Sequence, residues 1–174
     1  MLAACGFHGP PPLASGDDAT PAGDAAIGDA AVIGPPCPEL YPGGYRYDAT
    51  PRTWLDAERA CEADTVGRSH LVVMNDDAER AMVVAAIPVD VWVGIVRDPG
   101  GTAPWPWRYV TGGAATFAPW ESSEPNNLSG DQYVAGLRKA SGMIYDYGAA
   151  NLVGSLCECD GMPPVNADFD PATP

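Results

Sequence analysis

Oxygen-bearing side chains flank a proline in one short stretch of the sequence, Glu124-Pro125-Asn126. Glutamate offers a carboxylate and asparagine an amide oxygen, and calcium in proteins takes about 6–8 oxygen ligands, several of them from carboxylates. The two side chains are therefore candidate ligands of a cation, and further ligands must come from elsewhere in the chain. The alternative is that both are solvated loop residues. We interpret the next residue, Asn127, as a turn residue.

The other reactive residues do not assemble into an enzyme site. The sequence has two histidines, of which His8 lies in a low-complexity segment and His70 precedes an expected strand, where a structural or exposed role is the simpler interpretation. One domain histidine does not yield a Ser-His-Asp set, and no Gly-Lys-Ser/Thr phosphate loop is present. Cys157 and Cys159 lack the second cysteine or histidine pair of a tetrahedral zinc site. We expect a protein that is not an enzyme.

Composition and charge narrow the class of partner. The 174 residues are 46% hydrophobic, which is typical of one globular domain. There are 23 acidic and 9 basic residues, giving a net charge of −14. Nucleic acid is excluded as a partner, because phosphate binding needs a basic face. No apolar run approaches the roughly 18–20 residues of a membrane-spanning helix.

The two ends of the chain differ from its middle. Residues 1–5, Met-Leu-Ala-Ala-Cys, resemble the lipobox of a truncated bacterial lipoprotein signal, in which cleavage precedes a cysteine that is then acylated. The basic and apolar parts of a signal peptide are missing, so the alternative is an N-terminus with one spare thiol at Cys5. Residues 6–36 are small, acidic and rich in Gly and Pro, which predicts a disordered linker. We expect a similar disordered tail at 161–174.

Periodicity predicts two helices followed by short strands. Thr50-Pro51 is typical of a helix start, with Thr as N-cap and Pro in the first position, and the helix should run to about Ala63. Asp76 and Glu79 predict a capping box that opens a second helix ending near Ile87. A strand hairpin is expected around residues 42–44. Further strands are expected at 71–74, 91–95, 108–110, 133–137, 143–145 and 152–158. This order predicts an α+β fold.

Between these strands, residues 98–131 contain only one brief expected strand. A long segment without regular structure inside a compact domain is usually functional. Such a loop needs internal packing, and four aromatic residues can supply it: Trp105, Trp107, Phe117 and Trp120. We therefore expect a functional segment here.

Taken in order, a series of short motifs resembles the C-type lectin-like domain over residues 37–160. The motifs are Cys37-Pro38, Trp54-x-x-Ala57-x-x-x-Cys61, Leu71-Val72, Glu79, Trp92-Val93-Gly94, Val110-Thr111-Gly112-Gly113, Trp120-x-x-x-Glu124-Pro125-Asn126-Asn127 and Cys157-Glu158. Each motif is weak alone, but their order and spacing together are specific. The resemblance implies a double-loop fold, in which two helices flank small antiparallel sheets and a long loop, here 98–132, carries the ligand site.

The resemblance also implies a disulfide framework. In such domains the cysteine of the first helix bridges to the last strand, which pairs Cys61 with Cys157. Cys37 and Cys159 remain at the start and end of the domain, and since the terminal strands pair in the family, we predict a second bridge between them. Cys5 is then the odd cysteine, which favours lipidation over a stray exported thiol. The alternative is a reduced cytosolic protein with buried thiols.

The ligand site that the resemblance implies holds one calcium ion. Its expected ligands are Glu124, Asn126, Asp131 and Asp146, with a cis peptide bond before Pro125. Two adjacent hydroxyls of a sugar would complete the shell and contact Glu124, Asn126 and Asp131, and Glu-Pro-Asn order goes with mannose, glucose or fucose-type diols. Tyr145 stands where the family has an asparagine ligand, and we expect it to lie beside the sugar. Because one ligand is lost, we expect a calcium dissociation constant in the weak extracellular range, about 10⁻⁴–10⁻³ M.

Two functional hypotheses follow. The first is a calcium-dependent carbohydrate-binding module of an exported protein, held at the cell envelope by a lipid on Cys5 or secreted, whose partner is a carbohydrate or glycoconjugate. The second is a calcium-independent module on the same fold that binds a protein ligand. Glu124-Pro125-Asn126 favours the first hypothesis, and Tyr145 favours the second.

Overall fold

The computed structural model describes residues 37, 41–97, 104, 106–128 and 130–165. No helix within these ranges has both the length and the apolar character needed to span a membrane. The expected signal at 1–5 with Cys5, the linker at 6–36 and most of the tail at 161–174 lie outside the described residues.

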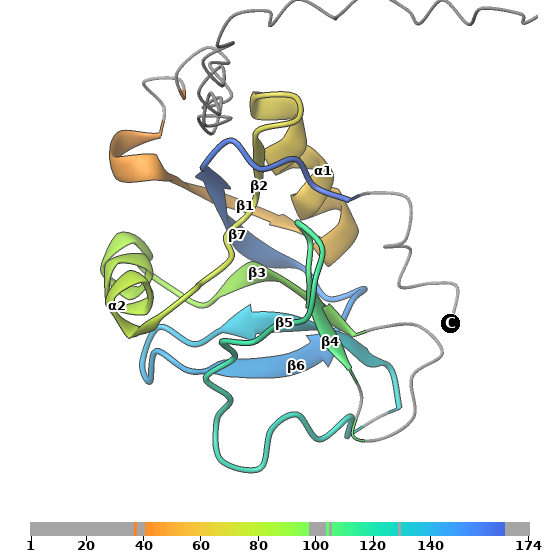
Figure 1. The fold of residues 1–174 in the computed structure, drawn as a ribbon. Helices are drawn as coiled ribbons and strands as arrows, with labels where there is room; N and C mark the ends of the chain where they lie inside the picture. The colour runs from red at the N-terminus through yellow and green to blue at the C-terminus, as the bar shows by residue number, and fades with distance from the viewer. Residues whose placement is uncertain (1–36, 38–40, 98–103, 105, 129, 166–174) are drawn as a thin grey trace, which may run out of the picture. The chain divides into compact units, whose positions relative to one another are not determined.

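The elements follow the expected α+β order (Figure 1). They are η1 (Pro42–Gly44), β1 (Tyr45–Arg52), α1 (Trp54–Asp64), β2 (Ser69–Leu71), α2 (Asp77–Ala86), β3 (Val91–Arg97), β4 (Trp107–Tyr109), β5 (Gln132–Leu137), β6 (Ile144–Gly148) and β7 (Val153–Cys159).

The strands form one connected mixed sheet in place of the small antiparallel sheets that we expected. The order along its main path is β1-β7-β3-β5-β6, with β2 also paired to β7 and β4 paired to β3. All pairs are antiparallel except β3–β7, which is parallel, with Val91 opposite Gly154. The last strand therefore lies inside the sheet and joins its two halves.

The predicted start of the first helix is wrong. Thr50 and Pro51 belong to β1, and the helix begins at Trp54 after the N-cap Thr53, whose side chain accepts a hydrogen bond from the Asp56 N–H at 3.2 Å. Among the described strands β1 pairs with β7 alone, so it is an edge strand of this sheet, where a proline without an N–H group is tolerated. Long-range pairing thus outweighs the local helix signal.

The expected hairpin around residues 42–44 is also wrong in the part of the chain that the structure describes. η1 is a tight turn, closed by a hydrogen bond from Gly44 N–H to Tyr41 O at 3.0 Å. The strand that follows it finds its partner at the other end of the domain, with Tyr45 opposite Glu158.

The second helix confirms the predicted N-cap. The Asp76 carboxylate accepts from the Glu79 N–H at 2.8 Å, while the Glu79 side chain accepts from the Asn75 N–H at 2.7 Å. In a standard capping box the glutamate would bond the N-cap residue itself. The helix ends at Ala86.

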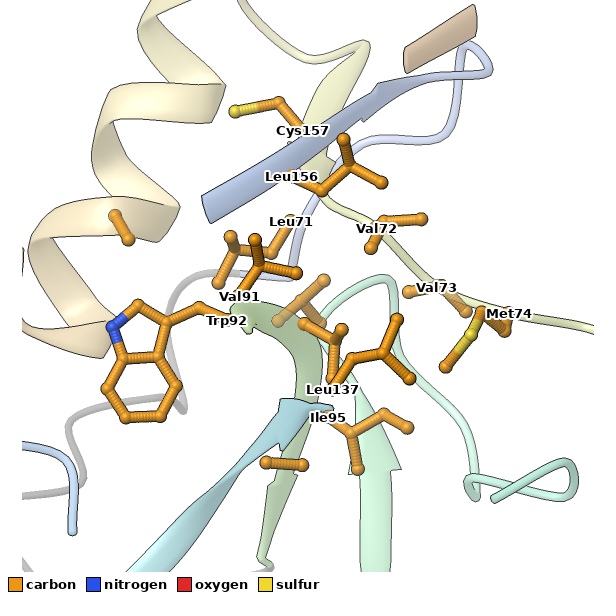
Figure 2. Close-up of a cluster of buried hydrophobic side chains, with 14 of the residues drawn as sticks. Leu71, Val72, Val73, Met74, Val91, Trp92, Ile95, Leu137, Leu156 and Cys157 are labelled. Carbon is orange, nitrogen blue, oxygen red and sulfur yellow. The ribbon is translucent and has the colours of Figure 1, made fainter. Parts of the chain in front are cut away.

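The core lies between α1 and the central strands. The predicted face of α1, Trp54, Ala57 and Cys61, is fully buried. Figure 2 shows the side chains that meet in this core, among them Leu71, Val91, Leu137 and Leu156. Gly94 in β3 has no room for a side chain, because an added Cβ would collide with the Leu71 carbonyl oxygen and Val110. This close approach fixes β2, β3 and the end of β4 at the base of the loop.

Both predicted disulfides are confirmed. Cys61 of α1 is bonded to Cys157, and Cys37 is bonded to Cys159, with Cα–Cα distances of 5.3 and 5.9 Å. Both bridges end on β7, which is therefore tied covalently to the first helix and to the start of the domain.

Candidate functional site

Aromatic residues hold the described part of the long loop together, as predicted. The rings of Trp107 and Trp120 pack at 4.7 Å between centroids. The Tyr109 hydroxyl accepts from Phe117 N–H at 2.8 Å and donates to Phe117 O at 3.1 Å. Trp105, the fourth expected aromatic residue, lies outside the described residues.

The loop is fixed to β6 just before the candidate ligands. Ile144 N–H donates to Pro119 O, and Glu121 N–H donates to Ile144 O, each at 2.9 Å. The Glu121 carboxylate accepts from Ser141 Oγ and Arg138 Nε, both at 2.7 Å, and the Ser141 hydrogen bond followed by Arg138 lowers its pKa. These contacts hold the loop to the β5–β6 hairpin three residues before Glu124.

Glu124, Asn126 and Asp146 are brought together. The Glu124–Pro125 bond is cis, as the resemblance implied. The Asn126 side-chain amide donates to Glu124 Oε1 at 2.9 Å. Asp146 is 1% exposed, and its carboxylate accepts from the backbone N–H groups of Asn126 at 3.2 Å and Asn127 at 2.7 Å. Three of the four predicted calcium ligands therefore share one place.

The charges of this group are unbalanced. Burial, followed by the neighbouring Asp146, raises the pKa of Glu124 to about 7. Among the described residues, the buried Oε2 atom of Glu124 has no hydrogen-bond partner. A buried polar atom without a partner is costly, and two adjacent carboxylates repel one another. A divalent cation would relieve both effects, so the residues fit a calcium ion.

Asp131, the fourth predicted ligand, lies beside this group without joining it. It is exposed, and its Oδ2 atom lies against Gly148, 3.4 Å from where a Cβ on that glycine would be. Within the described ranges, Glu124, Asp131 and Asp146 do not form a set of carboxylates whose oxygens all lie within 4.8 Å of one another. The role of Asp131 as a ligand stays a prediction.

Tyr145 is packed on the other face of β6. Neighbouring residues of a strand point to opposite faces, so Tyr145 and Asp146 diverge. The ring is 6% exposed, lies against Gly136, and has the Arg138 guanidinium 4.2 Å from its centroid. Burial raises the pKa of its hydroxyl to about 12. Its expected contact with a sugar stays a prediction.

Two backbone-positioning residues, Asn127 and Gln132, received no site role from the sequence. Asn127 has a φ of 47° and accepts from Gln132 N–H through its side chain at 3.1 Å, while Gln132 donates to Asp146 O at 3.2 Å. Asparagine is common at positive φ, which supports its interpretation as a turn residue. The turn closes the segment between Asn126 and Asp131.

A second polar cluster, at the far end of β7, was missed. His70, Glu158 and Asp160 each offer a ligand atom, and these atoms all lie within 4.8 Å of one another. The spacing of Glu158 and Asp160 predicts that both side chains point to one side of an extended chain. Nothing local in the sequence shows that His70 lies beside them.

Comparison with known proteins identifies the family. The model of the Lectin C-type domain family matches residues 50–159. C-type lectin BML-2 of Bungarus multicinctus is 30% identical over 123 residues, covering 66% of this chain and 75% of that protein. Lithostathine of Bos taurus is 29% identical over 114 residues, which cover 58% of this chain and 60% of that protein.

The fold is shared with solved members of the family. The mouse scavenger receptor C-type lectin carbohydrate-recognition domain matches with a TM-score of 0.61 at 23% identity, covering 70% of this chain and 96% of that chain. At this identity the likeness shows the fold alone. The family is non-enzymatic, in agreement with the expectation from the reactive residues. Since the family model matches more than half of the chain and the two disulfides and fold agree with it, the protein belongs to the C-type lectin domain family.

Proposed function

We propose that this chain is a calcium-dependent carbohydrate-binding module for sugars with mannose, glucose or fucose-type diols. The observation that carries the proposal is the convergence of Glu124, Asn126 and Asp146, with one Glu124 oxygen lacking a partner in the described part of the chain. Asp131 is the fourth proposed ligand. A calcium ion bound there would supply open coordination positions for two hydroxyls of a sugar.

The protein groups around that ion have distinct tasks. Asp146 is already oriented by two backbone N–H groups, so its carboxylate is held in place before any ligand arrives. Glu124 and Asn126 lie closer to solvent, and their carboxylate and amide can accept from and donate to sugar hydroxyls. Hydrogen bonds to an ionised carboxylate are stronger than neutral ones. Glu-Pro-Asn order supports the proposed class of diol.

The affinity for calcium should be low. Tyr145 replaces a side chain that would supply an oxygen ligand, and its ring is held on the opposite face of β6. With one ligand fewer, we place the dissociation constant in the weak extracellular range, about 10⁻⁴–10⁻³ M.

Export is part of the proposal. Disulfides persist in oxidising compartments, and this domain has two of them in the described residues. We propose that the module is secreted or held at the cell envelope by a lipid on Cys5. Mass spectrometry of Cys5-containing peptides from membrane fractions tests the anchor, because an acyl group adds a defined mass and an unmodified thiol contradicts lipidation.

Thermal melting tests the calcium site. A ligand that binds only the native state raises its stability by about 2.7 kcal/mol at 100 times its dissociation constant. Calcium at tens of millimolar should raise the melting temperature over a chelator control, and mannose should raise it further only with calcium. Glu124→Gln should abolish both shifts.

A matched control separates this site from loose calcium binding by an acidic protein. Asp77 is an exposed carboxylate on α2, and Asp77→Asn removes the same charge away from the loop. This variant should respond to calcium like wild type. A folded wild-type protein that shows no calcium shift contradicts the proposal and leaves the calcium-independent protein-interaction module, which Tyr145 favours.

A further inference from the structure

The pairing of β2 with β7 brings three metal-ligating side chains to one face of the sheet. His70 lies directly opposite Glu158 in the antiparallel register. Asp160 follows Glu158 by two residues, and residues two apart on an extended chain point the same way. Cys157 and Cys159 alternate with them and form the disulfides, so the acidic and cysteine side chains of this segment leave it on different sides.

The cluster runs from the interior to the surface. His70 is fully buried and Glu158 is 6% exposed, whereas the Asp160 side chain is 26% exposed and forms the rim. An ion could therefore reach the two buried groups past Asp160. One oxygen of Glu158 accepts from the Val73 N–H at 3.1 Å, and a carboxylate has lone pairs left for a second contact.

The imidazole of His70 is oriented toward the two carboxylates. Its Nδ1 lies 2.8 Å from Leu71 O, and because a carbonyl only accepts, Nδ1 must carry the hydrogen of that bond. Its Nε2 lies 3.1 Å from Asp160 Oδ1. Metal-binding histidines typically donate one ring N–H to a carbonyl and direct the other nitrogen at the ion. Here Nδ1 bonds the Leu71 carbonyl, and Nε2 faces the Asp160 carboxylate.

We propose that His70, Glu158 and Asp160 form a binding site for a divalent transition-metal ion of the zinc type, separate from the calcium site of the loop. One imidazole nitrogen with two carboxylates suits zinc, whereas calcium and magnesium prefer oxygen ligands alone. Three protein ligands leave a fourth position for water or an outside group, at the solvent side marked by Asp160.

Cobalt and zinc titrations of the full, oxidised chain test this site. After removal of metals with a chelator, one equivalent of Co²⁺ should develop visible absorption, and one equivalent of Zn²⁺ should displace it. Asp160→Asn should weaken Zn²⁺ binding at least about tenfold, since losing even an outer partner of a metal site costs about 10–100-fold. His70→Gln should abolish the cobalt spectrum.

Two controls locate the ion. His8→Gln removes the only other histidine of the sequence and should leave the titration unchanged. Glu124→Gln should remove the calcium shift and keep zinc binding, while Asp160→Asn should do the reverse. The two sites can thus fail independently of one another.

Three outcomes would overturn the proposal. They are a wild-type protein that binds neither ion, zinc binding that is as tight in Asp160→Asn as in wild type, and zinc binding that is lost in His8→Gln or Glu124→Gln. In each case the cluster is an ion pair between His70 and Asp160 without a metal. Because a variant at buried His70 can lose the fold, the rim variant Asp160→Asn, with its far-ultraviolet circular dichroism as a folding check, decides the question.

Discussion

Carboxyl groups gather in two regions of this molecule, and their hydrogen-bond partners differ between the two. At the base, where α1 and β7 flank β2, Glu58 accepts from the Leu71 N–H at 2.8 Å and Glu158 accepts from the Val73 N–H at 3.1 Å. In the loop, the Glu124 carboxylate accepts from the side-chain amide of Asn126 at 2.9 Å. An oxygen of Glu58 also lacks a partner in the described residues, so an unpaired oxygen alone does not separate the two regions.

The group bonded to the other oxygen does separate Glu124 from Glu58 and Glu158, while Asp146 beside Glu124 is bonded to backbone N–H groups as the base carboxyls are. A carboxyl bonded to a backbone N–H group holds a chain segment in place, and its loss leaves a buried amide unsatisfied. A carboxyl bonded to an exposed side chain does not fix a backbone segment in this way. The base also has both disulfides, while the described part of the loop has none. We infer that stability is concentrated at the base, and the proposed calcium and sugar site lies in the loop.

The largest effect that tests this comparison is loss of the core disulfide. Cys61 and Cys157 are 96 residues apart in sequence, and closing a loop of about 100 residues is worth roughly 4–5 kcal/mol in the chain-entropy model. The double variant Cys61→Ala with Cys157→Ala should lose that much free energy of unfolding, measured by urea denaturation. A loss below about 1 kcal/mol would contradict the inference that stability is concentrated at the base.

A smaller effect should appear in the pH dependence of stability. Burial raises the pKa of Glu58 to about 8 from an ordinary value of 4.5. The folded state therefore keeps a proton that the unfolded state loses, so this contribution is complete below pH 4.5 and disappears as pH rises toward 8. Without metals, the free energy of unfolding of wild type should fall between pH 5 and 8 by on the order of 3 kcal/mol relative to Glu58→Gln.

This comparison uses glutamine because it keeps the size and an acceptor for the Leu71 N–H group while removing the titration. Chemical denaturation at several pH values provides the measurement. Parallel curves for wild type and Glu58→Gln would mean that the Glu58 carboxyl ionises normally, and that the base is not an apolar environment for it.

The smallest effect is expected in the loop. Without calcium, Glu124→Gln should lower the free energy of unfolding by no more than about 0.5 kcal/mol, because glutamine keeps an oxygen for the Asn126 amide. Removing the Glu124 charge also relieves the repulsion from Asp146, which helps to raise the pKa of Glu124. Urea denaturation in chelator measures the change, and a loss above about 2 kcal/mol would make Glu124 a structural residue like Glu58.

Local signals in the sequence predicted much of the fold. The face of α1, the Asp76 N-cap and the order of strands follow from spacing alone, and the resemblance added the disulfides and the cis bond before Pro125. The start of α1 was misplaced because Thr50-Pro51 carries a genuine helix signal. Pairing of β1 with β7, more than 100 residues away, decides its structure instead.

The sites divide in the same way. Glu124 and Asn126 are neighbours in sequence, so their meeting could be predicted, and Asp146 came from the resemblance. His70 meets Glu158 and Asp160 only through a register between distant strands, and single-sequence patterns do not contain that register. Tyr145 was identified as a departure, but its packing on Arg138 depends on the β5–β6 hairpin.

The bridge between Cys37 and Cys159 places the two ends of the folded unit 5.9 Å apart between Cα atoms. Domains whose ends meet can be inserted into a surface loop of another protein without stretching the host. This domain is therefore suited to insertion into another protein, because the chain enters and leaves it at one point. In such a chimera the same disulfide would keep the two insertion points of the host close together even if the inserted domain unfolds.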